Sequence, residues 1–151
     1  MRLKYSIKAD EKKSTKIVRA MGRDMNISFK DAVMVADKIR GMKLKKALTY
    51  LEGVSELKKT VPYPRYNKGI GHRKGNTIKS SKYPQKVAKH VIGVLKNIEA
   101  NAEFKGLDLD KVKLSHVQAQ KGIDRKRRKP TGRWGSWTTQ YVHFQIIAEE
   151  I

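Results

Sequence analysis

The chain has 151 residues, a formal net charge of +21 and an isoelectric point near 10.2. This length allows one domain with a sizeable core, and so large an excess of positive charge indicates a polyanionic partner, with nucleic acid as the default. The absence of cysteine excludes disulfides and thiolate metal sites, and the lack of a long apolar run or an apolar signal sequence predicts no membrane insertion.

The first part of the chain predicts an arm, a strand and a helix. Residues 1–16 are polar and mixed in charge, so we expect an extended arm rather than a packed element. Residues 17–27 are predicted as a strand with a bulge or bend at Gly22. Ser28 is a good helix N-cap, and apolar residues then recur at helical spacing until Gly41, which should end the helix.

A second helix follows at once and is expected to end at Gly53. Two short helices with a tight joint form an αα-hairpin, which also permits a DNA-binding helix-turn-helix. The residues available at the start of the second helix offer charge but little base readout, so DNA binding is the alternative rather than the first hypothesis. These residues are Lys43, Lys45 and Lys46.

The stretch 57–98 contains eleven Lys or Arg and no acidic residue. Within it, residues 60–83 lack periodicity and mix basic side chains with tyrosines. Such a segment inside a compact domain is usually functional or disordered, and this composition suits phosphate neutralisation and base stacking. A solvated linker is the alternative. The candidate RNA-binding residues of this basic insertion are Arg65, Tyr66, Lys68, His72, Arg73 and Lys74.

Residues 85–105 predict the longest helix and the spine of the core. Pro84 suits a helix start, and Gly106 can cap the other end. The apolar residues that recur at helical spacing are Val87, Val91, Val94, Leu95, Ile98 and Ala102.

Residues 111–149 predict one long β-hairpin, because both ends are rich in β-branched and aromatic residues. The segment 129–132 suits a type I turn, which would put the midpoint of the hairpin at Pro130. The apolar residues that share one face of the return strand are Val142, Phe144, Ile146 and Ala148.

The middle of this hairpin is too charged to form a core and too long to lie on the rest of the chain. Each half would extend at most about 60 Å, whereas the remaining chain would have a radius of gyration of only about 13 Å. A two-stranded ribbon is marginal alone in water, so we expect a polyanion to hold it. The two tryptophans could stack on bases or pack on the opposite strand. The candidate contacts are Lys121, Arg125, Lys126, Arg127, Arg128, Arg133, Trp134 and Trp137.

These elements predict an α+β fold, with three helices packed on a small three-stranded antiparallel sheet and a long protruding β-hairpin. We expect residues 1–151 to form a single domain. One face of the sheet should then be open or covered by a partner.

No pattern for catalysis, metal binding or cofactor binding is present. The glycines between Gly69 and Gly75 do not have the spacing of a nucleotide-binding loop. The four histidines lack metal-ligand spacing, and the acids form no nucleophile–base set. We therefore expect no metal and no cofactor, and an RNA-processing enzyme is the least supported alternative.

Two segments resemble the L22 family of universal ribosomal large-subunit proteins. They are Val35–Lys43 (VADKIRGMK), continued by Lys45–Leu48, and Asn97–Glu103 (NIEANAE). The basic hairpin with Gly132-Arg133 near its tip and His143 in the return strand also matches, so the resemblance covers about residues 17–150. The basic insertion is similar to the archaeal and eukaryotic branch of this family.

The resemblance implies a non-enzymatic constituent of the cytoplasmic ribosome that binds large-subunit rRNA and assists its assembly. Its globular part would lie near the mouth of the nascent-peptide exit tunnel, beside neighbouring large-subunit proteins. Its hairpin would thread through rRNA, and the tip would line the tunnel and face the nascent polypeptide. The tip residues are Lys129, Pro130, Thr131, Gly132 and Arg133, a shorter tip than the family pattern P-R-A-x-G-R.

Overall fold

The computed structural model describes residues 5–6, 16–74 and 78–151. In this part of the chain it contains three helices and a three-stranded antiparallel sheet in the order β1-β5-β4. The predicted α+β class, the helices and this sheet are therefore confirmed. The elements are β1 (Ile17–Met25), α1 (Phe29–Ile39), α2 (Leu44–Ser55), β2 (Val61–Pro62), β3 (Ser81–Lys82), α3 (Gln85–Phe104), β4 (Val112–Arg128) and β5 (Ser136–Glu150).

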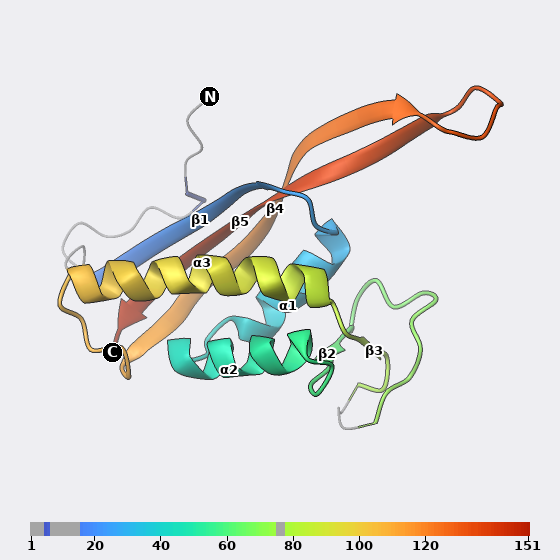
Figure 1. Cartoon of the computed structure of the whole chain (residues 1–151). Helices are drawn as coiled ribbons and strands as arrows, with labels where there is room; N and C mark the ends of the chain where they lie inside the picture. The colour runs from blue at the N-terminus through green and yellow to red at the C-terminus, as the bar shows by residue number, and fades with distance from the viewer. Residues whose placement is uncertain (1–4, 7–15, 75–77) are drawn as a thin grey trace.

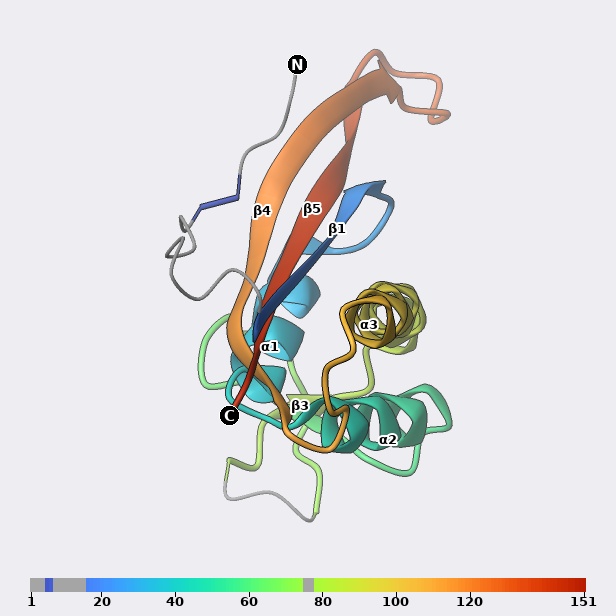
Figure 2. The ribbon, with the colours of Figure 1, turned by 90° about the vertical axis from the view of Figure 1, so that its left-hand side faces the viewer.

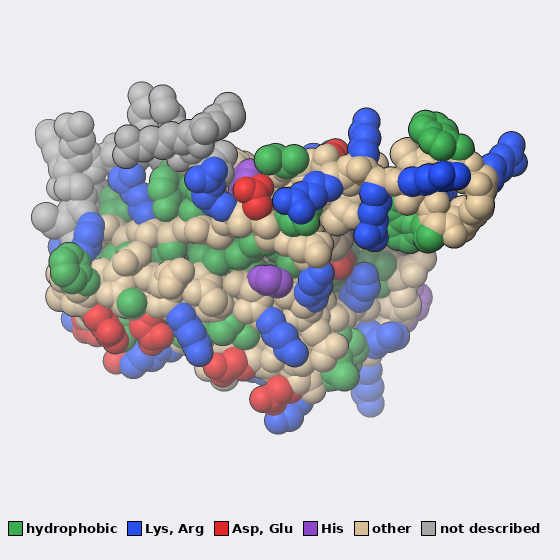
Figure 3. Space-filling model, turned by 45° about the horizontal axis from the view of Figure 1, so that its top comes forward, with side chains coloured by type: hydrophobic (Ala, Val, Ile, Leu, Met, Phe, Trp, Pro, Cys, Tyr) green, Lys and Arg blue, Asp and Glu red, His purple; other side chains and the backbone are tan. Residues whose placement is uncertain are grey.

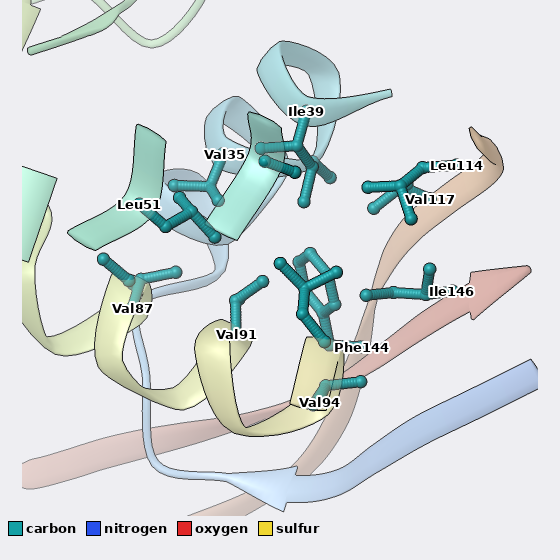
Figure 4. Packing of buried hydrophobic residues seen from close by; sticks show 14 of the residues in the cluster. Val35, Ile39, Leu51, Val87, Val91, Val94, Leu114, Val117, Phe144 and Ile146 are labelled. Carbon is teal, nitrogen blue, oxygen red and sulfur yellow. The ribbon is translucent and has the colours of Figure 1, made fainter. Parts of the chain in front are cut away.

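The helices α1 and α3 lie on one face of the sheet, and α2 packs mainly against α3 (Figures 1 and 2). Side chains from all three helices and from β4 and β5 meet in the layer between them (Figure 4). Phe144 lies on the central strand of the sheet and is fully buried in this layer. Burial of apolar side chains against the sheet is thus what orders the helices.

The apolar face predicted for the return strand is the face of β5 that packs on the helices, and its residues are fully buried. The matching face of β4 carries Val112, Leu114 and Val117, which are also buried. A register shift between Leu114 and His116 inserts Ser115, so that Val117 returns to the core side. A second shift, between Gly22 and Met25, confirms the bulge or bend that Gly22 predicted in β1.

The end of α1 is fastened to β4. Gly41 follows the helix with φ +78°, the left-handed conformation expected of it, and its N–H donates to the carbonyl of Leu114 at 2.8 Å. The Arg40 guanidinium donates to the carbonyl of Val117 at 2.8 Å and forms an ion pair with Asp37 at 3.3 Å. The segment 35–43 singled out in the sequence therefore joins a helix end to the strand beside the bulge.

The segment 97–103 has a similar structural role at the other edge of the sheet. It lies in the last turns of α3, where the side-chain amide of Asn101 donates to the carbonyl of Arg19 in β1 at 3.1 Å. Ala102 is fully buried one residue later. Asn101 thus fixes α3 to the edge strand.

Gly53 does not end α2, which continues to Ser55. Leu57 takes the left-handed conformation instead, with φ +64°. The carbonyl of Gly53 accepts the N–H groups of Lys58 and Lys59 at 2.8 and 2.9 Å, and the Lys59 side chain covers the glycine, where a Cβ would lie 3.0 Å from it. The glycine was predicted as a cap, but it provides space for the chain that returns over the helix.

The hairpin turn also differs from the prediction. The last pair of the β4–β5 ladder is Arg128–Ser136, so the connection is a loop of residues 129–135 centred on Gly132 rather than a four-residue turn at Pro130. Gly132 has φ +60°, and the N–H of Lys129 donates to the carbonyl of Gly135 at 2.9 Å. The left-handed glycine reverses the chain within this wider loop.

The basic insertion is closed at its base by a short ladder of β2 and β3, which sequence periodicity did not reveal because each strand has two residues. Two tyrosines fasten it to the helices. Tyr50 of α2 donates its hydroxyl to the carbonyl of Thr60 at 2.7 Å, and Tyr63 donates to a carboxylate oxygen of Asp31 at 2.8 Å. Both bonds hold the first end of the insertion, and the ladder ties its last residues to that end.

The second face of the sheet was expected to be open or covered by a partner, but the chain itself covers part of it. Gln145 of β5 is fully buried on this face, where its Oε1 accepts the N–H of Ser6 at 3.1 Å and its Nε2 donates to Gln120 at 3.1 Å. Tyr5 and Ser6 lie against the sheet rather than in an unpacked arm. Residues 1–4 and 7–15 of the predicted arm lie outside the described residues.

Replacing Phe144 with alanine should lower the free energy of unfolding by about 3–5 kcal/mol, because a fully buried aromatic ring leaves a cavity that the sheet cannot fill. Phe104 provides a matched control, since its ring is 94 % exposed and its replacement should change stability by no more than about 0.5 kcal/mol. Chemical denaturation of the two variants measures both effects. Equal losses of unfolding free energy in the two variants would contradict the burial of Phe144 in the core.

The Tyr50 hydroxyl should make stability fall above pH 10. Burial raises the pKa of Tyr50 from 10.0 to about 12, so the tyrosine of the unfolded chain ionises first and stability is lost as pH rises from about 10 through 12. Replacing Tyr50 with phenylalanine should remove this contribution, so that unfolding between these pH values releases about one proton fewer. Denaturation curves of wild type and variant across this range test the prediction, and parallel pH dependences would refute it.

Candidate nucleic-acid interface

The hairpin leaves the globular part just beyond Lys121. A register shift between Lys121 and Asp124 bends β4 there. Gly122 lies in this bend, where a Cβ would be only 3.0 Å from the carbonyl oxygen of Tyr141, so the absence of a side chain lets the strands approach. Beyond the bend the two strands stay paired to Arg128 and form an arm, residues 122–141, that extends past the helices (Figure 1).

The two faces of the arm both carry positive charge. Because side chains alternate along a strand, Arg125 and Arg127 share one face and Lys126 and Arg128 the other. The guanidinium of Arg125 lies 5.1 Å from the ring centre of Tyr141. That of Arg127 lies 5.9 Å from the ring of Trp137, which is its direct partner across the ladder. Cation–π contacts with these aromatic rings thus orient the planar guanidinium groups of Arg125 and Arg127 along the arm.

The cations of the arm and its loop take part in no ion pair among the described residues. On the globular part several lysines do have acidic partners: hydrogen bonds raise the pKa of Lys45 through Asp110 and the pKa of Lys111 through Asp108. Figure 3 shows Lys and Arg side chains projecting along the arm, whereas several acidic side chains lie at the far end of the globular part. The arm therefore carries positive charge without acidic partners at the place where the protein projects.

The predicted tip residues and both tryptophans lie near the far end of the arm. Trp134 is 82 % exposed in the loop, and Trp137 is half exposed beside Arg127. Trp137 therefore packs beside Arg127 on the opposite strand of the hairpin, whereas the ring of Trp134 is exposed to solvent. The tip residues are Lys129, Pro130, Thr131, Gly132 and Arg133, and all are exposed.

The predicted residues of the insertion divide into four groups. Arg65 forms an ion pair with Asp37, so its charge is already partnered. Lys68 and Arg73 line a hollow between the insertion and the start of α1, together with Tyr66. His72 pairs through its backbone with Ser80, which narrows the insertion. The remaining predicted residue, Lys74, is exposed.

The start of α1 connects the insertion with the arm. Ser28 and Lys30 line the hollow beside the insertion and also a second hollow, which extends to Trp137 and Lys86. Lys30 and Lys86 were not predicted as site residues, because a single lysine in a helical segment carries no distinctive pattern. The fold places them between the two predicted basic segments and joins these into one basic surface.

Two of the lysines at the start of α2, where a DNA-recognition helix would contact bases, already have partners within the protein. Lys43 pairs with Lys113 in an isolated bridge to β4, and the Lys45 ammonium lies 2.7 Å from a carboxylate oxygen of Asp110. The described residues include no group of three or more His, Cys, Asp or Glu that could hold a metal ion. No helix in the described part of the chain is long and apolar enough to cross a membrane.

Comparison with known proteins agrees with this architecture. The sequence model of the family described as ribosomal protein L22p/L17e matches residues 20–149. The chain is 42 % identical to large ribosomal subunit protein uL22 of Archaeoglobus fulgidus, with 98 % of this chain and 96 % of the relative covered. The proteins of the same name from Methanococcus aeolicus and Ignicoccus hospitalis are 38 % and 41 % identical, with coverage of 99 % and 97 % of this chain and 97 % and 96 % of the relatives. The chain therefore belongs to the ribosomal protein L22p/L17e family, which its sequence resembled.

Proposed function

We propose that this chain is a structural constituent of the large ribosomal subunit that binds large-subunit rRNA and assists its folding during assembly in the cytoplasm. The structural role in the ribosome follows from the family, whose members are not enzymes, and from relatives named large ribosomal subunit protein uL22. The observation that carries the rRNA-binding part is the projecting arm, whose cations lack acidic partners in the described structure.

The chemistry of the arm suits folded RNA. Its cations would neutralise phosphates and release counterions, which makes binding strongly dependent on salt. The guanidinium groups of Arg125 and Arg127 lie over aromatic rings and would also meet unstacked bases. A two-stranded ribbon with this charge gains stability once RNA surrounds it, because the repulsion between its cations is removed. Because the cations lie on both faces of the arm, RNA would have to contact both faces to neutralise all of them.

The loop at the end of the arm is the part that we propose lines the nascent-peptide exit tunnel. It contains the tip residues 129–133 and lies far from the helices (Figure 1). An arm embedded in rRNA would carry this loop through the RNA to a surface on the other side. There the tip would face the nascent polypeptide, while the globular part contacts neighbouring large-subunit proteins. The family membership and the reach of the arm support this placement.

Binding of the intact protein to large-subunit rRNA should weaken steeply with salt, with log K falling by roughly 0.7–0.9 per log unit of salt for each phosphate neutralised. Joint replacement of Arg125, Arg127 and Arg128 with alanine should lower the affinity and reduce this slope by about 2–3. Filter binding of rRNA across a salt series measures both quantities. A nearly flat salt dependence of the wild type would overturn the proposed function.

A variant with the same loss of charge on the globular part is the matched control. Lys45, Lys58 and Lys111 are each paired with a carboxylate at 2.7–3.1 Å. Their joint replacement with alanine should leave the salt slope within about 1 of the wild type, because they contact no phosphate in the proposed arrangement. Circular dichroism should show folded helices in both triple variants. Equal loss of rRNA binding in the two would mean that total charge, rather than the arm, determines affinity.

A further inference from the structure

The hollow between the insertion and the start of α1 has the size of a site for one small ligand. Its volume is about 400 Å³, within the range of roughly 300–1,000 Å³ of pockets that enclose such ligands. Two parts of the chain line it: α1 contributes Lys30, and the insertion contributes Tyr66, Lys68 and Arg73 together with Lys82 of β3. Basic side chains therefore converge on one concave place from parts of the chain that are far apart in sequence.

The hollow is positively charged, although one acid lies in its wall. Asp31 is the acidic residue of the lining; it accepts a hydrogen bond from the Tyr63 hydroxyl at 2.8 Å and lies 3.5 Å from the Lys82 ammonium. In the part of the chain that the structure describes, Lys30, Lys68 and Arg73 take part in no ion pair. The charge left without a partner is cationic, so the hollow favours an anionic ligand.

Tyr66 gives the hollow an aromatic wall. Its ring is 43 % exposed and lies 5.9 Å from the Lys30 ammonium. Its backbone has φ +55°, a left-handed conformation that is unfavourable for a bulky side chain and that concentrates at ligand-binding positions. The turn after it is fixed by a hydrogen bond from the N–H of Ile70 to the carbonyl of Asn67 at 3.1 Å. The ring is thus held at the rim without being buried in the core.

We infer that this hollow binds a single unstacked nucleotide of the RNA, with the base against the ring of Tyr66 and the phosphates beside Lys68 and Arg73. Only a base that has left the helical stack exposes a face for an aromatic ring, so the site selects a bulged or looped nucleotide over a duplex. This inference rests on the proposed function and makes the insertion a second RNA contact, distinct from the arm.

Three replacements of Tyr66 test the inference in the intact protein. Tyr66→Ala should reduce affinity for large-subunit rRNA by about 5- to 150-fold, the loss expected for one stacked base, without changing the salt slope. Tyr66→Phe should stay close to wild type, because the ring face is kept. Tyr66→Gly should bind as weakly as the alanine variant although glycine tolerates the left-handed backbone. Phe104→Ala, an exposed aromatic residue outside the hollow, should bind like wild type.

The outcomes separate this site from the proposed function. If wild type binds rRNA with a steep salt slope and the alanine variant binds equally well, the nucleotide site is wrong and the proposed function stands. If the glycine variant binds like wild type, Tyr66 acts only through the backbone and the inference fails. Ultraviolet crosslinking of assembled subunits should join one nucleotide to the peptide that contains Tyr66. A crosslink from Tyr66 to another protein would overturn the inference.

Discussion

The continuous ladder between β4 and β5 is the constraint on which the rest of the structure depends. The same two strands supply the centre of the core, through Phe144 and Leu114, and the backbone of the arm, as far as Arg128. In the arm, β4 therefore changes from apolar to charged residues and β5 from apolar to polar and aromatic residues, while the two strands stay paired. The bends at Ser115 and Gly122 permit this, because the first keeps Val117 in the core and the second turns the ladder away from it.

The helices anchor the sheet that contains this ladder. The end of α1 is fastened to β4 through Arg40 and Gly41, and α3 is fastened to β1 through Asn101. These residues belong to the two segments that carry the family resemblance, and in the described structure they hold the sheet. Positive charge is then free to accumulate on the arm and the insertion, where few buried contacts oppose it.

Periodicity predicted the layers of the fold because burial acts on a repeating face: the stripe of α3 and the face of β5 follow directly from it. Local sequence signals failed where the same residue type can serve more than one structural role. Gly53 and the 129–132 segment carry ordinary cap and turn signals, but a returning side chain and a wider loop decide their geometry. The basic segments were recognisable by charge, whereas the position of Lys30 between them depends on the tertiary fold.

The pairing of β1 with β5 ends at Met25 opposite Val142. In the described structure no third strand therefore accompanies the arm, and the outer backbone groups of both its strands are available to other chains. Such open edges invite strand-to-strand association between copies of a protein. The dense positive charge of residues 125–129 opposes that association, since two arms placed edge to edge would repel each other. The same charge for which we propose RNA as the partner thus also opposes association between two copies of the chain.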